Sequence, residues 1–184
     1  MIDIDVNLDD LIKRLPSEKT ARKVVWRALN RGVTAGRTHA SRELARNYAI
    51  KVSRARHSSG IKKASVSTPE ATIVFRGRPL NIVHFKVMPG KPQPARRPVL
   101  RAVFRKSKGP VEIKGAFLAN LRSGVRGARR KGRSRLPIEM VYGPSVPSMI
   151  STEDIREPVL KRMREVVIRR LDHEVTRELE KLSK

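Results

Sequence analysis

Apolar residues recur every three or four positions at both ends of the chain, which is the spacing of an amphipathic helix. Residues 6–15 show this spacing briefly, Pro16 ends that stretch, and residues 18–48 show it over a greater length. Residues 152–182 carry an apolar residue at every fourth position: Ile155, Val159, Met163, Val167, Leu171, Val175 and Leu179. The pattern predicts a short helix and two long ones, with a break or kink at Pro158 in the last.

Glycines punctuate the first long helix and the stretch that follows it. Gly32 and Gly36 weaken that helix, but they also permit a close packing contact with a neighbouring element. Residues 50–64 indicate a second helical piece, which is broken near Gly60. The helical part of the N-terminal half therefore ends before residue 70.

Apolar and polar residues alternate in the middle of the chain, as they do along half-buried strands. Five stretches show this alternation: residues 71–76, 80–87, 99–106, 111–117 and 136–142. Pro137 predicts an edge position for the last strand, and Pro144 and Pro147 predict an extended connection to the final helix. The layout predicts an α+β fold with a long N-terminal helix, a small, mostly antiparallel β-sheet and a C-terminal amphipathic helix. We expect residues 1–16 to form an arm with a short helix and residues 17–184 to form a single α+β domain.

Positive charge is concentrated in the middle of the chain. The whole sequence has 42 Lys and Arg residues against 17 Asp and Glu, which gives a net charge of +25. Residues 36–150 alone hold 26 of the basic residues and only four of the acidic ones, whereas both ends are nearly neutral. Because so large a charge repels itself, we expect an anionic partner in the working state. Nucleic acid, an anionic membrane and an acidic protein are the candidate classes.

The densest basic run has no apolar periodicity. Residues 124–135 are punctuated by glycine and predict a basic loop, as do the proline-rich residues 88–98. The candidate contact residues in the first loop are Arg126, Arg129, Arg130, Lys131, Arg133 and Arg135. Such a loop can bind DNA phosphates and release their counterions, or it can contact an acidic protein surface. No helix-turn-helix or zinc-finger pattern accompanies it, so we expect any DNA contact to be with the backbone and independent of sequence.

A second basic set lies on and after the first long helix. It comprises Arg37, Arg42, Arg46, Lys51, Arg54, Arg56, Lys62 and Lys63. A helix face exposed to solvent is the expected setting for these residues.

The residue types that catalysis needs are absent or scattered. The chain has no cysteine, which excludes disulfides and Cys-based zinc sites. The histidines form no ligand cluster, and the glycines match no nucleotide-binding loop; the histidines are His39, His57, His84 and His173. The sequence therefore predicts a protein that is not an enzyme, with no catalytic residue, no cofactor and no metal. It also shows neither a signal peptide nor a transmembrane stretch of about 18 apolar residues.

Two motifs resemble those of the minor tail protein Z family of bacteriophages. Residues 113–124 begin with Ile-Lys-Gly-Ala-Phe and are similar to a strand of the family and the turn after it. Residues 135–149 contain Arg-Leu-Pro-Ile and Gly-Pro-Ser-Val-Pro and are similar to the stretch before the family's final helix. The resemblance covers roughly residues 20–180. The motif residues have structural roles in this resemblance. Gly115 allows a tight backbone, Phe117 anchors the core, and the prolines set an extended path. The full set of motif residues is Gly115, Ala116, Phe117, Pro137, Gly143, Pro144 and Pro147.

The resemblance implies a tail completion protein of a long-tailed phage, which is located in the virion tail and in the host cytoplasm during assembly. Such a protein acts at the head-proximal end of the tail, in tail assembly, in head–tail joining and in positioning the genome end. Its expected partners are the tail tube, the tail terminator and the end of the tape measure protein. Because tail components commonly form rings, a homo-oligomeric ring is expected. The basic loop would then contact phage DNA or acidic tail subunits.

Two other classes of function are consistent with a basic chain. The first is a sequence-independent nucleic-acid-binding protein, which would bind tightly as an isolated monomer and with strong salt dependence. The second is a protein that lies on an anionic membrane surface. The near-balanced charge of the C-terminal helix argues against the second class, because membrane-surface helices carry a basic polar face.

Overall fold

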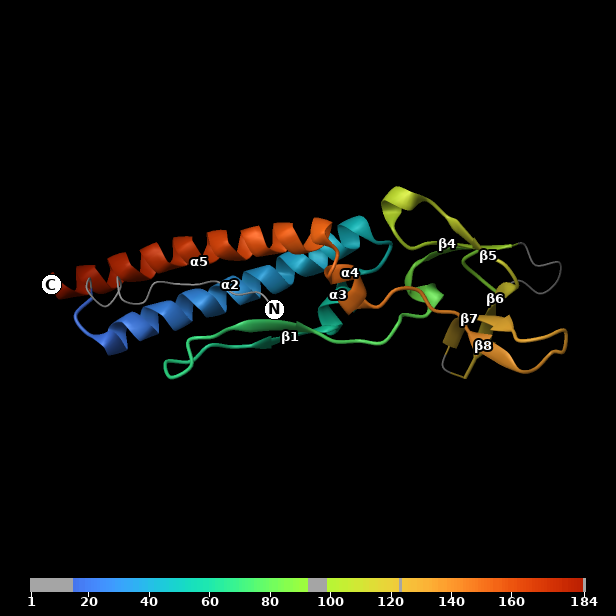
Figure 1. The fold of residues 1–184 in the computed structure, drawn as a ribbon, viewed down its shortest axis with the longest axis horizontal. Coiled ribbons are helices and arrows are strands. Elements are labelled where there is room, and N and C mark those ends of the chain that lie inside the picture. The colour runs from blue at the N-terminus through green and yellow to red at the C-terminus, as the bar shows by residue number, and fades with distance from the viewer. Residues whose placement is uncertain (1–14, 93–98, 123, 184) are drawn as a thin grey trace. The chain divides into compact units, whose positions relative to one another are not determined.

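The computed structural model describes residues 15–92, 99–122 and 124–183. Their contacts form two compact units (Figure 1). The first unit holds the described residues up to Ala40, with Ser59–Phe75 and the chain from Glu153 onward. The second holds Ser41–Ser58 and the described residues of Arg76–Thr152. The short helix expected over residues 6–15 lies, except for Leu15, outside the described residues.

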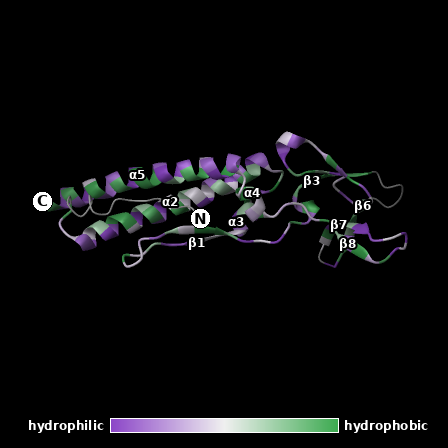
Figure 2. Ribbon diagram, viewed as in Figure 1, coloured by the Kyte–Doolittle hydropathy of each residue, from purple (hydrophilic) through white to green (hydrophobic). Residues whose placement is uncertain are grey.

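The first unit is built from two long helices and a β-hairpin. Helix α2 spans Glu18–Asn47 and begins in this unit, and helix α5 spans Glu153–Leu182. Strands β1 (Ser59–Lys62) and β2 (Thr72–Phe75) pair antiparallel. Hydrophobic and hydrophilic residues alternate along both helices (Figure 2), and the apolar faces meet in a core that includes Val25, Ala28, Leu29 and Val167. The two long amphipathic helices are therefore confirmed.

The two glycines of α2 allow α5 to pack closely against it. A Cβ at Gly32 would overlap the Val167 side chain, and one at Gly36 would overlap Met163. Both partners belong to the buried part of the α5 stripe. The close packing contact expected at these glycines is confirmed.

Helix α5 is continuous through Pro158, so a break there is wrong, and a kink at this proline stays a prediction. Proline removes one backbone N–H, and at this place near the helix N-terminus only the Asp154 carbonyl loses its usual donor. The flanking stripe residues Ile155 and Val159 are both buried. Their packing stabilises the turn that the proline weakens.

The second unit contains two three-stranded antiparallel sheets. The first has the order β3-β4-β5, with β3 over Lys86–Met88, β4 over Leu100–Val103 and β5 over Val111–Ile113. The second has the order β6-β7-β8, with β6 over Ala116–Leu121, β7 over Gly124–Arg130 and β8 over Ile138–Met140. A core that includes Ile82, Leu100, Ala116 and Leu118 joins the two sheets.

Short helices complete the second unit. Helix α3 spans Val52–His57, α4 spans Val146–Ile150, and the 3₁₀ turns η1 and η2 span Ile82–His84 and Lys106–Lys108. The α+β fold is confirmed, with three small antiparallel sheets among the described residues where the sequence predicted one. The edge position of the strand after Pro137 is confirmed, because β8 lies at the end of its sheet.

The second helical piece within residues 50–64 is confirmed as α3, and it ends before Gly60, where β1 follows. Two other element predictions are wrong. Residues 80–87 are not one strand, because the Asn81 side chain accepts a hydrogen bond from the Val83 N–H and starts η1 instead. Pro147 lies in the first turn of α4 and not on an extended path, because Ser145 caps this helix through the Ser148 N–H.

The expected division into an arm over 1–16 and one domain over 17–184 stays a prediction. Each compact unit draws on separate stretches of the chain, and α2 contributes residues to both. Neither unit is a continuous segment that could be cut out of the sequence, so compactness alone does not divide the chain into domains.

Candidate anion-binding surfaces

The basic run predicted as a loop over 124–135 is half strand and half loop. Arg126, Arg129 and Arg130 lie on β7, the central strand of its sheet, and Lys131, Arg133 and Arg135 lie in the connection to β8. The loop prediction is therefore wrong for residues 124–130. The backbone of this glycine-punctuated stretch pairs with β6 on one side and β8 on the other. A paired strand holds its side chains at fixed spacing, which a loose loop does not.

The six candidate cations are mostly exposed and carry little opposing charge. All are exposed except Arg126, which is half-buried. Arg129 lies opposite Glu139 in the register and pairs with it at 3.6 Å, with both side chains about half exposed. The Arg130 guanidinium lies 6.0 Å from the Phe117 ring centre, which is the range of a cation–π contact. Arg129 lies on one face of the strand and Arg126 and Arg130 on the other, so exposed cations on both faces and on the loop can bind phosphates or carboxylates.

The family-motif residues support this sheet. Gly115 has φ +70°, which a glycine adopts without strain, in the turn before β6. A Cβ at Gly143 would lie 2.5 Å from a Phe104 ring atom, so a glycine is needed for the close approach there. The expected core anchor at Phe117 is wrong. Ala116 and Leu118 point into the core, and Phe117 lies half-buried between them in sequence, on the opposite face of β6.

A buried asparagine holds the η1 turn against β7. The Asn81 Nδ2 donates to the Gly127 carbonyl at 3.1 Å, and the Gly127 N–H donates to Asn81 Oδ1 at 2.9 Å. Ile82 fills the space where a Cβ at Gly127 would lie. This arrangement brings His84 into the field of Arg126. Burial, Arg54 and Arg126, in that order, hold the pKa of His84 below its usual value.

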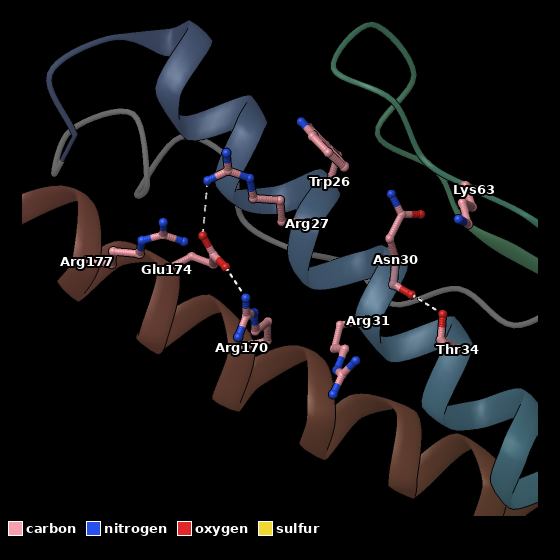
Figure 3. Close-up of a pocket in the computed structure, with 9 residues that line it drawn as sticks. All are labelled: Trp26, Arg27, Asn30, Arg31, Thr34, Lys63, Arg170, Glu174 and Arg177. Carbon is pink, nitrogen blue, oxygen red and sulfur yellow. Dashed lines mark hydrogen bonds and ion pairs between the residues drawn. The ribbon is translucent and has the colours of Figure 1, made fainter.

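The first unit contains a second cationic site, which the sequence did not predict (Figure 3). A cavity of about 600 Å³ lies among α2, α5 and the residues after β1. Five cations and a single carboxylate line it together with Trp26, Asn30 and Thr34: Arg27, Arg31, Lys63, Arg170, Arg177 and Glu174. Among the described residues, the buried indole N–H of Trp26 has no hydrogen-bond acceptor.

Glu174 is the internal counter-anion of this cavity. Its side chain is fully buried, and it pairs with Arg27 at 3.2 Å and with Arg170 at 2.5 Å, one on each side (Figure 3). Glu178 adds a second contact to Arg27 at 3.5 Å. The pairs join α2 to α5, so the cluster has a structural function whether or not an outside anion enters the cavity.

The local sequence hides this second site. The C-terminal helix is nearly neutral overall, and its cations are spaced by helical turns instead of gathered in a run. Helical spacing places Arg170, Glu174 and Arg177 on one side of α5, where they line a cavity together with Arg27 and Arg31 of α2. A helical-wheel comparison of the two long helices would have found Arg170 and Arg177 on one face, but not their alignment with Arg27 and Arg31.

The described residues were expected to contain neither a membrane-crossing helix nor a metal site. None of the helices there has both the length and the apolar character needed to cross a membrane. No group of three His, Asp or Glu side chains in the same part of the chain could hold a metal ion. The cationic strand and the cavity around Glu174 present guanidinium and ammonium groups, which can bind anions.

The structure thus defines a basic α+β protein with a cationic strand and loop in one unit and a cationic cavity in the other. The chain belongs to the family described as Prophage minor tail protein Z (GPZ), whose model matches residues 7–184. The match confirms the resemblance of the two sequence motifs and supports a structural role in the phage tail of the virion. Neither the curated proteins nor the solved structures include a match to this chain.

Proposed function

We propose that this protein is a tail completion protein that acts at the head-proximal end of the phage tail. It functions there in tail assembly, in joining the tail to the head and in positioning the genome end. Membership in the family supports a role in the phage tail. The positive charge supports a location at the head-proximal end. The upper end of a tail is where DNA and tail subunits meet, and the net charge of +25 calls for an anion of that kind.

The observation that carries the proposal is the cationic surface of β7 and the loop after it. We define this surface by Arg126, Arg129, Arg130, Lys131, Arg133 and Arg135, with Glu139 as its one close carboxylate among the described residues. Exposed Lys and Arg side chains bind DNA phosphates independently of sequence. DNA in the tail lumen is therefore its first expected ligand, and acidic tail subunits are the second.

The proposal is tested by deleting the coding segment from an inducible prophage. We expect induced cells to release heads and tails that are not joined, or particles that do not inject, and we expect the intact gene in trans to restore infectivity. Particle counts by electron microscopy and plaque counts provide the measurement. Infectious particles at normal yield from the deletion strain would refute the proposal.

DNA binding by the isolated protein tests the alternative function, that of a free nucleic-acid-binding protein. That alternative predicts tight binding of the isolated protein to any DNA, with an affinity that falls steeply as salt rises. A tail protein whose cations act only within an assembly predicts weak binding by the free chain. In both cases the membrane is not an expected partner.

A further inference from the structure

Part of the second basic set is exposed to solvent, as expected, and also lines an open cavity. Lys51 and Arg54, at the start of α3, meet His84 of η1 around a cavity of about 320 Å³ in the second unit. Its six lining residues include no carboxylate: Lys51, Ser53, Arg54, His57, Val83 and His84. Five of the six side chains carry hydrogen-bond donors.

Two elements hold these donors in fixed positions. On α3, Arg54 and His57 are three residues apart and so share one face of the helix, and His57 Nδ1 lies 2.7 Å from the Ser53 carbonyl. On η1, His84 is held over β7 by the bonds between Asn81 and Gly127. The η1 wall of the cavity is therefore attached to the same sheet that carries the cationic surface.

The contact between Arg54 and His84 sets the imidazole tautomer. Arg54 Nη2 lies 3.3 Å from His84 Nδ1. Because a guanidinium only donates hydrogen bonds, Nδ1 must accept, and a neutral His84 then has its proton on Nε2. The lowered pKa of His84, caused by burial and by Arg54 and Arg126, is consistent with the neutral form. The Nε2–H of His84 is therefore a further hydrogen-bond donor in the cavity. It lies beside Lys51 and Arg54, and the cavity lining contains no carboxylate to neutralise these cations.

We propose that this cavity binds one phosphate group of the DNA backbone, through Lys51, Ser53, Arg54, His57 and His84. A tetrahedral phosphate accepts hydrogen bonds from several directions, which fits donors that come from two separate elements. Arg126, one of the cations of the cationic surface, adds to the positive charge that acts on His84. The DNA part of this inference rests on the proposed function, but the phosphate site itself does not.

An anion in the cavity would also change the protonation of His84. A negative charge next to the imidazole favours the imidazolium, so binding raises the pKa of His84 from its depressed value. By linkage, the affinity for the anion increases as pH falls through the pKa of the bound state. The charged groups that face His84 are Lys51 and Arg54 on the α3 side and Arg126 on β7, and His57 is the other imidazole in the cavity lining.

The direct test uses sulfate, which has the geometry of phosphate but does not titrate near neutral pH. Histidine ring signals of the full-length protein are followed by NMR during sulfate addition at several pH values. We expect saturable shifts at His84, an upward change in its pKa, and loss of both in Arg54→Ser. Arg56→Ser on the same helix, outside the cavity, is the matched control and should bind normally. Shifts that do not saturate, or that persist unchanged in Arg54→Ser, would overturn the site.

A second variant separates positioning from charge. His84→Gln keeps a donor but cannot titrate, so we expect sulfate binding to persist while its dependence on pH is largely lost. If the pH dependence of sulfate binding survived in His84→Gln and disappeared in His57→Gln, the linked proton would belong to His57. That result would contradict the role of His84.

A short DNA duplex then identifies the source of the phosphate. For Arg54→Ser we expect weaker duplex binding and a salt slope smaller by about one, as for one lost phosphate contact. Sulfate binding that is lost in Arg54→Ser together with unchanged DNA binding would mean a site for a free anion, and would overturn the DNA part alone. If the prophage deletion showed that the protein has no role in the tail, the evidence for sulfate binding in the cavity would be unaffected.

Discussion

Gly127 and Asn81 show how single residues place a surface. Gly127 leaves the space that Ile82 fills, and its backbone forms two hydrogen bonds with the buried Asn81 side chain. Neither residue carries charge, yet together they fix η1 and His84 against the strand that carries the arginines. The sequence marked Gly127 only as one of several glycines in a basic run. The contact that makes it necessary comes from a residue 46 positions away.

Gly127→Ala should therefore destabilise the protein. The added methyl group meets the Ile82 side chain inside the core, and overpacking of this kind costs about 1–3 kcal/mol. Gly132→Ala is the matched control, because nothing lies within 4 Å of a Cβ there, and it should change stability by less than about 0.5 kcal/mol. Thermal unfolding of both variants provides the comparison. Equal melting temperatures would contradict the packing account.

Glu174→Gln should also destabilise the fold. The carboxylate is fully buried and neutralises Arg27 and Arg170, whose side chains are about a third exposed. Removing its charge leaves these cations close together, and because water screens them partly we expect a loss of about 1–3 kcal/mol. Glu165→Gln, which changes an exposed carboxylate on the same helix, serves as the control. Chemical denaturation measures both. A loss as small as that of the control would contradict the role of internal counter-anion.

At the scale of elements, the sequence predicted what local periodicity determines and missed what pairing determines. The stripe on α5 and the spacing on α2 follow from the period of a helix, so both long helices were predicted to within a residue at each end. Strand β7 has no alternation of its own, because Gly124, Gly127 and the arginines interrupt it. Its hydrogen bonds come from β6 and β8 on its two sides, and a local pattern does not contain them.

The candidate site was predicted as a set of residues but not as a shape. All six cations of the cationic surface were named from the sequence, since a dense run is visible without a fold. Three features were not predicted, because each combines residues from distant elements. They are the strand that spaces three of these cations, the cavity at His84 and the cavity around Glu174.

The cationic surface should account for most DNA binding. We expect replacement of Arg129, Arg130, Lys131 and Arg133 by Ser to weaken duplex binding and to reduce the salt slope by up to about 3.6, at about 0.9 per lost phosphate contact. The control removes the same charge from exposed residues of the first unit: Lys19, Lys23, Lys161 and Arg164 to Ser. Fluorescence titrations at several salt concentrations measure both slopes. Equal slopes for the two variants would show that total charge, and not this surface, determines binding.

At the scale of the whole molecule, the charge of +25 is the property that an assembly must neutralise. A free chain with this charge repels its own copies, so close packing of copies requires DNA or acidic subunits between or beside them. We expect the protein to form a homo-oligomeric ring on the tail, and to do so more readily with an anionic partner present. Native mass spectrometry with and without short DNA or purified tail tube tests this. A stable monomer under all of these conditions would contradict the ring.

The central claim is the position of this protein at the head-proximal end of the tail. Cryo-electron microscopy of particles from the induced prophage, compared with particles from the deletion strain complemented by a tagged copy, tests it most directly. The account predicts tag density in a ring where the tail meets the head, with the cationic surface toward the DNA path or an acidic tube subunit. Tag density at the distal tip, or no difference between the two particles at the head-proximal end, would contradict it.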